Sequence, residues 1–600
     1  MSKQRQRKRF IDRIRGSWVP YWQATLDLLS YETIAMVLKT IFVRAIYLVT
    51  NYLLKLAGRV AVTSGDFGFL FMSWQGWLLI IATFVIVLGY MTMDINTKIL
   101  YTSDLVKGEK ISIRKNLKDA IVSWKKFASV PGILLIIYIT LIVPVVGFGL
   151  SISLTENFYI PTFITSVIKD RTLYYVPYVI FMIVFWVIGF IYIFCIHGVL
   201  LDDMSVMDAL RNSRKLVLSH KKDYIKQHLL FIFNLVLLFI ILLIFGLFIP
   251  FIISELLMGS SEVWFRFLLI FFLTAGIVVF SFFNGYIGSY YLIKITELYY
   301  TYQTNQRVHI PNIKRKKHTF AYLMFIASFL FVLGFSFILN IVFDDVFHSD
   351  VSVKVIAHRA GGTDAPENTI KGIETAYEEK AFGSEIDIQR TKDGYYIVNH
   401  DTTFERLSHV KKKPQDMTLA EIKELRVQDP NYPDSPQPIA TIEEMLDATK
   451  GKVKLFIELK GSTADIQMAE DTIRLMRERD MLDECVLISL KYDLIAYIED
   501  NYPEIETGYL TFASFGDTAS LKCDYLGLEE ESASSAVIAR IHEQNKKVMV
   551  WTVNTPESQK YFLKRNVDAI ITDKVNQANG IIDKLENRSD FELIFDLLLN

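Results

Sequence analysis

The sequence predicts a protein of two parts, an α-helical transmembrane bundle followed by an α/β domain of the (β/α)8 TIM-barrel type. Long apolar segments recur through the first half of a chain that is 52% hydrophobic, and runs of about twenty apolar residues are typical of membrane-spanning helices. Residues 353–585 differ, because short strand-like runs alternate there with helical segments, which indicates βαβ units and a parallel sheet. The length of 600 residues also exceeds what one hydrophobic core supports.

We divide the chain into four parts. Residues 1–32 form a strongly basic segment, which we expect to be retained because no apolar core with a cleavage site follows it closely. The multi-pass membrane domain occupies residues 33–345, and the barrel domain occupies residues 353–585. Residues 586–600 end in FELIFDLLLN, an amphipathic tail that can pack either on the barrel or on the membrane.

Seven segments of the membrane domain have the length and composition of a span. The first is the weakest, because Lys39 and Arg44 interrupt it. Contact between neighbouring helices explains the asparagines within the later segments more simply than a transport path does. The seven predicted spans are 33–56, 71–93, 129–151, 175–199, 228–253, 265–298 and 319–343.

The stretches that connect these segments alternate in charge. Lysine and arginine accumulate on the cytoplasmic side of membrane proteins. Here they crowd the N-terminus, 94–127, 200–227 and 299–318, whereas 57–70, 152–174 and 254–264 are poor in them. With seven crossings, we expect a cytoplasmic N-terminus and an extracytoplasmic barrel. The basic stretches 115–128 and 206–224 fit either interfacial helices or ordinary charged connectors.

Charge and cysteine content exclude some classes of function. Lysine plus arginine number 64 against 65 acidic residues, and this balance gives no sign of a nucleic-acid partner. Only three cysteines occur, without the spacing of a metal site, so a disulfide framework is not expected.

Nine strand candidates compete for eight places in the barrel. They are 353–359, 383–389, 395–399, 452–460, 485–490, 506–510, 523–528, 546–553 and 568–572. The extra one is 395–399, because the stretch before it is too short for a crossover helix. A two-residue turn at Asp393–Gly394 suits a hairpin instead. This hairpin would pair Arg390 with Ile397 and bring His400 back beside Asp387, about 5 Å apart at Cβ.

Polar residues gather at the predicted strand ends, where barrel active sites assemble. Three of them, Glu385, Asp387 and Glu458, are carboxylates, and an oxygen-only donor set favours one hard divalent cation, Ca²⁺ or Mg²⁺. The others are His358, Arg359, His400, Lys460 and Trp551.

Two histidines beside a metal site indicate acid–base chemistry on an anion, and a phosphodiester fits. The cation and Arg359 would neutralise phosphate oxygens, while one imidazole removes a proton and the other supplies one. Two residues have plainer alternatives: Lys460 can be the structural ion-pair partner of Glu458, and Trp551 can be barrel packing. Which histidine acts first as the base stays open.

These residues form an ordered set of motifs that resembles the glycerophosphodiester phosphodiesterase family. The resemblance covers most of 353–575, and the spans before it resemble, more loosely, the multi-pass membrane module of some bacterial members. The motifs are His358-Arg359, Pro366-Glu367-Asn368-Thr369, Glu385-x-Asp387, Thr391-x-Asp393-Gly394, His400-Asp401, Glu458-x-Lys460 and Trp551-Thr552.

The resemblance implies a barrel hydrolase that releases glycerol 3-phosphate and an alcohol, with a substrate hydroxyl attacking its own phosphorus. We expect a substrate at the membrane surface, near membrane lipids, and three kinds stay open: deacylated phospholipid head-group diesters, lysophospholipids and polyglycerophosphate polymers of a cell envelope. The implied roles are metal ligation by Glu385, Asp387 and Glu458, acid–base catalysis by His358 and His400, and substrate or phosphate binding by Arg359, Lys460 and Trp551.

One position departs from the family pattern, because Ala360 stands where the family usually has glycine. If that position has a positive φ, alanine strains the turn. The departure keeps a second hypothesis open, a membrane transport or scaffold protein whose degenerate barrel only binds phosphodiesters.

Overall fold

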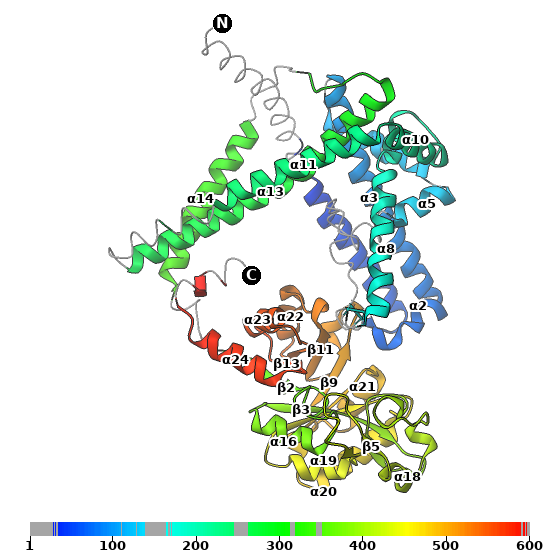
Figure 1. Ribbon diagram of the computed structural model, residues 1–600, viewed down its shortest axis with the longest axis vertical. Helices are drawn as coiled ribbons and strands as arrows, with labels where there is room; N and C mark the ends of the chain where they lie inside the picture. Colours follow the sequence, from blue (N-terminus) through cyan, green and yellow to red (C-terminus); the bar gives the residue numbers. More distant parts are fainter. Residues whose placement is uncertain are drawn as a thin grey trace.

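A computed structural model describes most of the chain, and Figure 1 shows long helices in its upper part and the barrel at its lower end. The described residues are 34–138 except 110 and 128, 171–244, 262–311, 319–343 and 351–589, together with 28, 31, 164, 165, 168, 169, 252, 592–594 and 596.

Five helices of the described part are long and apolar enough to cross a membrane: Ile34–Leu56, Trp74–Lys107 (α3), Thr172–Leu201 (α8, Thr172–Ile191, with α9, Cys195–Leu201), Lys221–Ile240 within α11 (Lys221–Leu243) and Val263–Ser281 within α13 (Glu262–Thr304). The pair Ile113–Phe127 and Val130–Ile137 bends by 115°, so it is either a sixth, broken span or a re-entrant loop.

Each of the seven predicted segments overlaps a helix of the structure. The segment 129–151 begins in α5 (Val130–Ile137), and 319–343 coincides with α14 (Thr319–Ile341), whose apolar stretch is Phe325–Ile341. The segments 129–151 and 228–253 run into residues outside the described part. The count of seven spans therefore stays a prediction.

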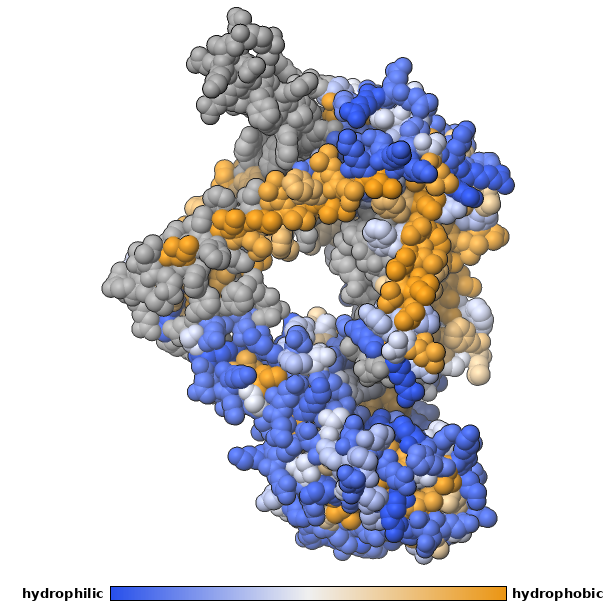
Figure 2. Space-filling model, in the orientation of Figure 1, coloured by the Kyte–Doolittle hydropathy of each residue, from blue (hydrophilic) through white to orange (hydrophobic). Residues whose placement is uncertain are grey.

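The surface of the helical part is divided by polarity. Figure 2 shows hydrophobic surface along α8 and α13, between a hydrophilic region around α10 (Val206–Ser219) and the hydrophilic barrel. Many large apolar side chains on these helices are exposed, as expected where lipid tails replace water. Both basic connectors contain helices, α4 (Ile113–Ser123) and α10, and Ser112 and Ser205 cap their first turns.

Eight parallel strands close into the barrel in the order β2-β3-β7-β8-β9-β11-β12-β13. All nine predicted strand segments are confirmed. In chain order they are β2 (Lys354–Ala357), β3 (Gly383–Arg390), β4 (Tyr396–Val398), β7 (Lys454–Leu459), β8 (Cys485–Ser489), β9 (Thr507–Thr511), β11 (Tyr525–Glu529), β12 (Lys547–Trp551) and β13 (Ala569–Thr572).

Apolar side chains fill the barrel inside and helices cover it outside. The inner core includes Ile356, Phe456, Ile488, Leu510 and Met549. Capping boxes open α18 (Leu419–Lys423) and α19 (Ile442–Thr449). The other helices around the barrel are α16 (Ile370–Glu378), α17 (Glu405–Ser408), α20 (Ile466–Glu478), α21 (Tyr492–Asn501), α22 (Ser535–His542), α23 (Pro556–Leu563) and α24 (Val575–Glu586), and the small sheet β5 (Arg426–Val427) with β6 (Gln437–Pro438) lies beside them.

The extra strand β4 pairs antiparallel with β3, as predicted, but the predicted register is wrong by one residue. Arg390 lies opposite Tyr396 and not opposite Ile397. The turn is longer than two residues, because Thr391 donates its backbone N–H to the Tyr395 carbonyl and accepts from the Tyr395 N–H through its hydroxyl. These two hydrogen bonds close a wider loop than the Asp-Gly pair alone predicts.

The shift in register changes the residue that lies opposite Asp387, but the hairpin still brings His400 close to Asp387. The backbone N–H of Asn399 donates to the Asp387 carbonyl at 2.9 Å, and His400 is the next residue. His400 and Asp387 interact electrostatically in the structure. The hairpin therefore returns His400 to the side of the carboxylates, as expected.

Several contacts join the barrel to the membrane helices: Arg540 donates to the Tyr47 hydroxyl at 2.7 Å, and two larger contacts follow. In the first, β1 (Ala61–Thr63), from the connector 57–70, pairs antiparallel with β10 (Ser514–Gly516), from the loop after β9. In the second, the tail packs Leu593 and Ile594 against apolar residues of α13 and α14. Asp596 of the same tail forms ion pairs with Lys564 of the barrel and with Arg588 of the tail itself. The tail therefore packs on the barrel, one of the two surfaces considered, and also on helices of the membrane domain.

Candidate active site

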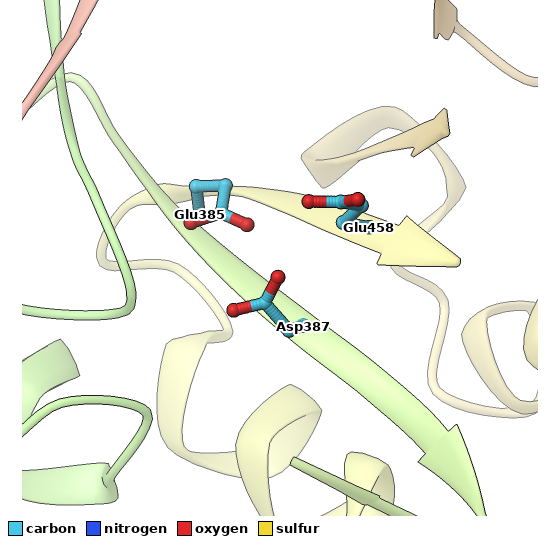
Figure 3. Close-up of side chains that lie close together, drawn as sticks. All are labelled: Glu385, Asp387 and Glu458. Carbon is cyan, nitrogen blue, oxygen red and sulfur yellow. The ribbon is translucent and has the colours of Figure 1, made fainter. Parts of the chain in front are cut away.

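Three carboxylates converge at the carboxyl end of two neighbouring strands. Glu385 and Asp387 belong to β3, where residues two apart face the same side, and Glu458 belongs to β7. Asp387 lies opposite Glu458 in the parallel pair. Figure 3 shows the three carboxyl groups turned toward one another. The structure thus brings together the three residues predicted as metal ligands, which we call the acidic triad.

The acidic triad fits a hard divalent cation. One oxygen from each residue lies within 4.8 Å of the others, and all three side chains are buried. Burial and the charge of Asp387 raise the pKa of Glu385 to about 8. Burial also raises the pKa of Glu458 to about 7, although Lys460 opposes this shift. Although burial opposes the shift, Lys460 and other cationic groups lower the pKa of Asp387, so this member stays charged. One charged carboxylate beside two carboxyls whose negative charge needs a cation suits Ca²⁺ or Mg²⁺.

Neighbouring donors hold the acidic triad in place. The backbone N–H of Arg359 donates to Glu385 Oε2 at 2.8 Å, and the Asn368 amide donates to Asp387 Oδ2 at 2.9 Å. Lys460 Nζ lies 2.9 Å from Asp387 Oδ1 and 2.9 Å from Glu458 Oε2. Lys460 therefore makes the ion pair with Glu458 that the sequence left open, and it neutralises two of the three carboxylates.

His358 follows β2 and is held by a carboxylate that the sequence analysis missed. Its Nδ1 lies 2.6 Å from Asp573 Oδ1, and the Asn554 amide donates to the other oxygen of Asp573. Burial lowers the pKa of His358, but the charge and hydrogen bond of Asp573 outweigh burial and raise the pKa above its ordinary value. Although burial opposes it, His358 in turn lowers the pKa of Asp573 to about 2.

His400 lies in a different environment. Its Nδ1 lies 2.9 Å from Asp401 Oδ1, and Arg406 donates to the other Asp401 oxygen at 2.7 Å. Arg406 also pairs with Glu367 at 2.5 Å, so that the Asp401 charge is shared. Burial lowers the pKa of His400, and the Asp401 hydrogen bond offsets burial only in part. The two histidines therefore have pKa values displaced in opposite directions.

The turn after β2 positions Arg359. Arg359 and Ala360 both have positive φ, at 49° and 76°, so the expected strain at Ala360 is present. The guanidinium of Arg359 forms an ion pair with Glu367 at 3.2 Å. Trp551 at the end of β12 is half-buried and packs against the inner core, so it lies at the mouth of the barrel and also serves in packing.

Sequence reasoning missed the second layer of polar contacts. Asp573 stands directly after the last barrel strand, the position shared by the other site residues, and this signal could have found it. Asn368 belongs to a quoted motif but had no role assigned. The contacts of Arg406 depend on how the loop after β4 folds back, which the chain's spacing does not reveal.

Fold and site together define a class of protein. A (β/α)8 barrel with an acidic triad, two histidines and a basic pair at the carboxyl ends of its strands is a phosphodiester hydrolase. Residues 358–577 match the model of the glycerophosphoryl diester phosphodiesterase family, and residues 22–338, more than half of the chain, match the membrane domain of glycerophosphoryl diester phosphodiesterase. The chain belongs to this family, in the group that carries the membrane domain.

Several known proteins resemble the barrel domain. The glycerophosphodiester phosphodiesterase of Caldanaerobacter subterraneus is 29% identical over 242 residues, which are 38% of this chain and 98% of the relative. The glycerophosphodiester phosphodiesterase of Bacillus altitudinis is 27% identical over 243 residues, 39% of this chain and 99% of the relative. A crystal structure of a glycerophosphodiester phosphodiesterase from Parabacteroides distasonis is 23% identical and covers 39% of this chain and 98% of its own, with a TM-score of 0.34.

The family membership confirms two predictions, a membrane protein and an enzyme that hydrolyses glycerophosphodiesters. The fold class predicted from the sequence is also confirmed.

Proposed function

We propose that the protein is a metal-dependent glycerophosphodiesterase that releases sn-glycerol 3-phosphate by two-histidine acid–base catalysis at the outer face of a membrane. The observation that carries this proposal is the buried acidic triad with two histidines whose pKa values are displaced in opposite directions. Paired titratable groups with such displacement take opposite roles in acid–base catalysis.

The environments of the histidines assign their roles. His400, whose pKa is lowered, is neutral at physiological pH and removes the proton from a glycerol hydroxyl of the substrate. The hydroxyl oxygen bonds to phosphorus and the bond to the leaving alkoxide breaks. His358, whose pKa is raised, is the proton donor to that alkoxide. Water then opens the cyclic phosphate while the histidines exchange roles.

The remaining residues bind and orient the diester. Glu385, Asp387 and Glu458 would hold the cation, which would supply stabilisation of negative charge on the phosphate oxygens. Arg359 presents a planar donor fork to those oxygens. Lys460 supplies a second positive charge beside the acidic triad, and Trp551 flanks the glycerol. One cation suffices, since the described residues offer one group of carboxylates at this distance.

The activity is tested by choline and glycerol 3-phosphate release from glycerophosphocholine by the purified full-length protein. We expect release with Ca²⁺ or Mg²⁺, loss of release with excess chelator, and recovery when the preferred cation is added back. Comparison of the two ions identifies the cation, because Mg²⁺ demands a more regular octahedral site. Release that is indifferent to chelator would contradict metal dependence.

We further propose that the basic segment 1–32 is cytoplasmic, the membrane domain 33–345 crosses seven times, and the barrel 353–585 with its tail 586–600 lies outside. The charge alternation of the connectors supports this orientation. The orientation places the site near lipid-derived diesters and polyglycerophosphate polymers of the envelope.

The orientation predicts which residues an impermeant thiol reagent reaches in intact cells. Asp434 is exposed on the barrel, and all three native cysteines are buried. Asp434→Cys should therefore be labelled in intact cells, whereas Lys215→Cys, on the connector helix α10, should be labelled only after lysis. The opposite pattern would place the barrel in the cytoplasm.

A further inference from the structure

The mouth of the barrel has two unlike halves. The strands β13, β2, β3 and β7 carry the polar half, with the carboxylates, His358 and Lys460, and the β3–β4 hairpin adds His400. On the other half, apolar residues lie at or directly after the strand ends: Leu490 follows β8, Phe512 follows β9 and Trp551 ends β12, and Leu490 and Trp551 pack on the inner core. Glu529 at the end of β11 stands between Phe512 and Trp551, and it accepts a hydrogen bond from a backbone N–H of its own loop.

The membrane domain docks on the apolar half. Its first extracytoplasmic connector forms β1, which pairs with β10 directly after Phe512. Next to β1, the Ser64 N–H donates to the Ala513 carbonyl and the Phe512 N–H donates to the Ser64 hydroxyl. The ring of Phe67 then lies 6.2 Å from the rings of both Phe512 and Phe515. A side chain of the membrane domain thus extends the apolar rim.

The contact between the connector and the barrel is as closely packed as a protein interior. Val62 is fully buried and Ala61 belongs to the hydrophobic core around the barrel. The hydroxyl of the buried Tyr509 donates to Thr63. A Cβ at Gly65 would stand 2.2 Å from the Leu490 carbonyl oxygen, so only glycine permits this approach. The connector is therefore a fixed wall of the mouth.

The wall continues into the surface of the membrane domain. Directly after Phe67, α2 (Gly68–Met72) and the start of α3 expose Phe71 (62%), Met72 (89%), Trp74 (62%) and Trp77 (51%). Aromatic residues at the end of a spanning helix lie at the membrane–water interface. Figure 1 shows α2 above the barrel, at the lower end of the helical part. An apolar path therefore leads from the interface across Phe67 to the mouth.

We propose that this path binds the acyl chain of a lysophospholipid, and that Phe67 determines specificity for such single-chain glycerophosphodiesters. The inference rests on the proposed function and deepens it. The proposed attack needs a free glycerol hydroxyl beside the phosphodiester. A diacyl lipid has none, whereas a lysophospholipid keeps one hydroxyl and one chain. The hydroxyl attacks phosphorus, the head-group alcohol leaves with a proton from His358, and water opens the cyclic phosphate to an acylglycerol phosphate.

The test compares two choline diesters with one readout. The full-length protein in detergent is assayed for choline release from water-soluble glycerophosphocholine and from 1-acyl lysophosphatidylcholine. Phe67→Ser should lower kcat/KM for the lysolipid about tenfold, because it removes apolar contact with the chain, and should change that for glycerophosphocholine less than about twofold. Phe67→Leu, which keeps an apolar side chain, should retain most lysolipid activity.

A matched control is Phe382→Ser, which removes a half-exposed phenylalanine just before β3, at the opposite end of the barrel. This variant should leave kcat/KM for both substrates unchanged. Equal losses on both substrates in Phe67→Ser would overturn the specificity role. A wild-type protein that cleaves glycerophosphocholine but not the lysolipid would overturn the inference and leave the proposed function standing, whereas failure on both substrates would overturn the proposed function itself.

Discussion

Asp387→Asn is expected to lower the rate of glycerol 3-phosphate release by at least about 10³-fold, because the amide cannot replace a charged ligand of the cation. Asp387 is the central member of the acidic triad: it lies opposite Glu458, two residues from Glu385, and within 2.9 Å of Lys460. The same variant should also lose the rise in melting temperature that Ca²⁺ or Mg²⁺ gives the wild-type protein, since a ligand that binds only the folded state stabilises it.

The matched control for this variant is Glu421→Gln. Glu421 is also a barrel carboxylate, but it closes the capping box of α18, a position that glutamine fills as well. Activity and the metal-dependent melting shift should both survive there. If Asp387→Asn kept the melting shift while losing activity, Asp387 would act on the substrate and not as a metal ligand.

Stability without metal should depend on pH in a direction fixed by two members of the acidic triad, Glu385 and Glu458. Glu385 and Glu458 have folded pKa values of about 8 and about 7, above the ordinary glutamate value. The folded state then binds more protons than the unfolded state, so stability falls as pH rises from the ordinary value toward 8. The chelated protein should therefore melt at a lower temperature at pH 8 than at pH 5. Added cation should raise the melting temperature more at pH 8 than at pH 5.

The sequence predicted the barrel well for a physical reason. Each buried strand needs a short run of apolar, often β-branched residues, and such runs at regular spacing are visible without a structure. The acidic triad was also predictable, since Glu385 and Asp387 share a face through the two-residue period and Glu458 ends another strand. Contacts that depend on local periodicity can thus be predicted from the sequence.

Other features depend on long-range contacts that the periodicity of the sequence does not predict. The β3–β4 register shifted by one residue because the Thr391 hydroxyl widened the turn. Asp573 pairs with His358 across 215 residues of sequence. The β1–β10 pairing joins a short connector of the membrane domain to a loop of the barrel, and three residues of strand are too few to stand out in a sequence. This pairing nevertheless decides which half of the mouth contacts the membrane domain.

Replacing either histidine by alanine is expected to lower kcat by about 10²–10⁴-fold, the range typical of a general acid or base. The two variants should differ in their pH profiles. A base must be neutral, so the acid limb of the wild-type profile belongs to His400, whose lowered pKa extends activity toward acid. An acid must be protonated, so the alkaline limb belongs to His358, whose raised pKa extends activity toward alkali.

Asp573→Asn separates these assignments without removing an imidazole. The change deletes the negative charge that raises the pKa of His358, so the alkaline limb should move to lower pH while the acid limb stays in place. The control is His542→Gln, because His542 and Asp568 form a similar pair at the opposite end of β13, 2.9 Å apart, and both limbs should then be unchanged. Movement of the acid limb in Asp573→Asn would instead make His358 the base, and the roles of the two histidines would have to be exchanged.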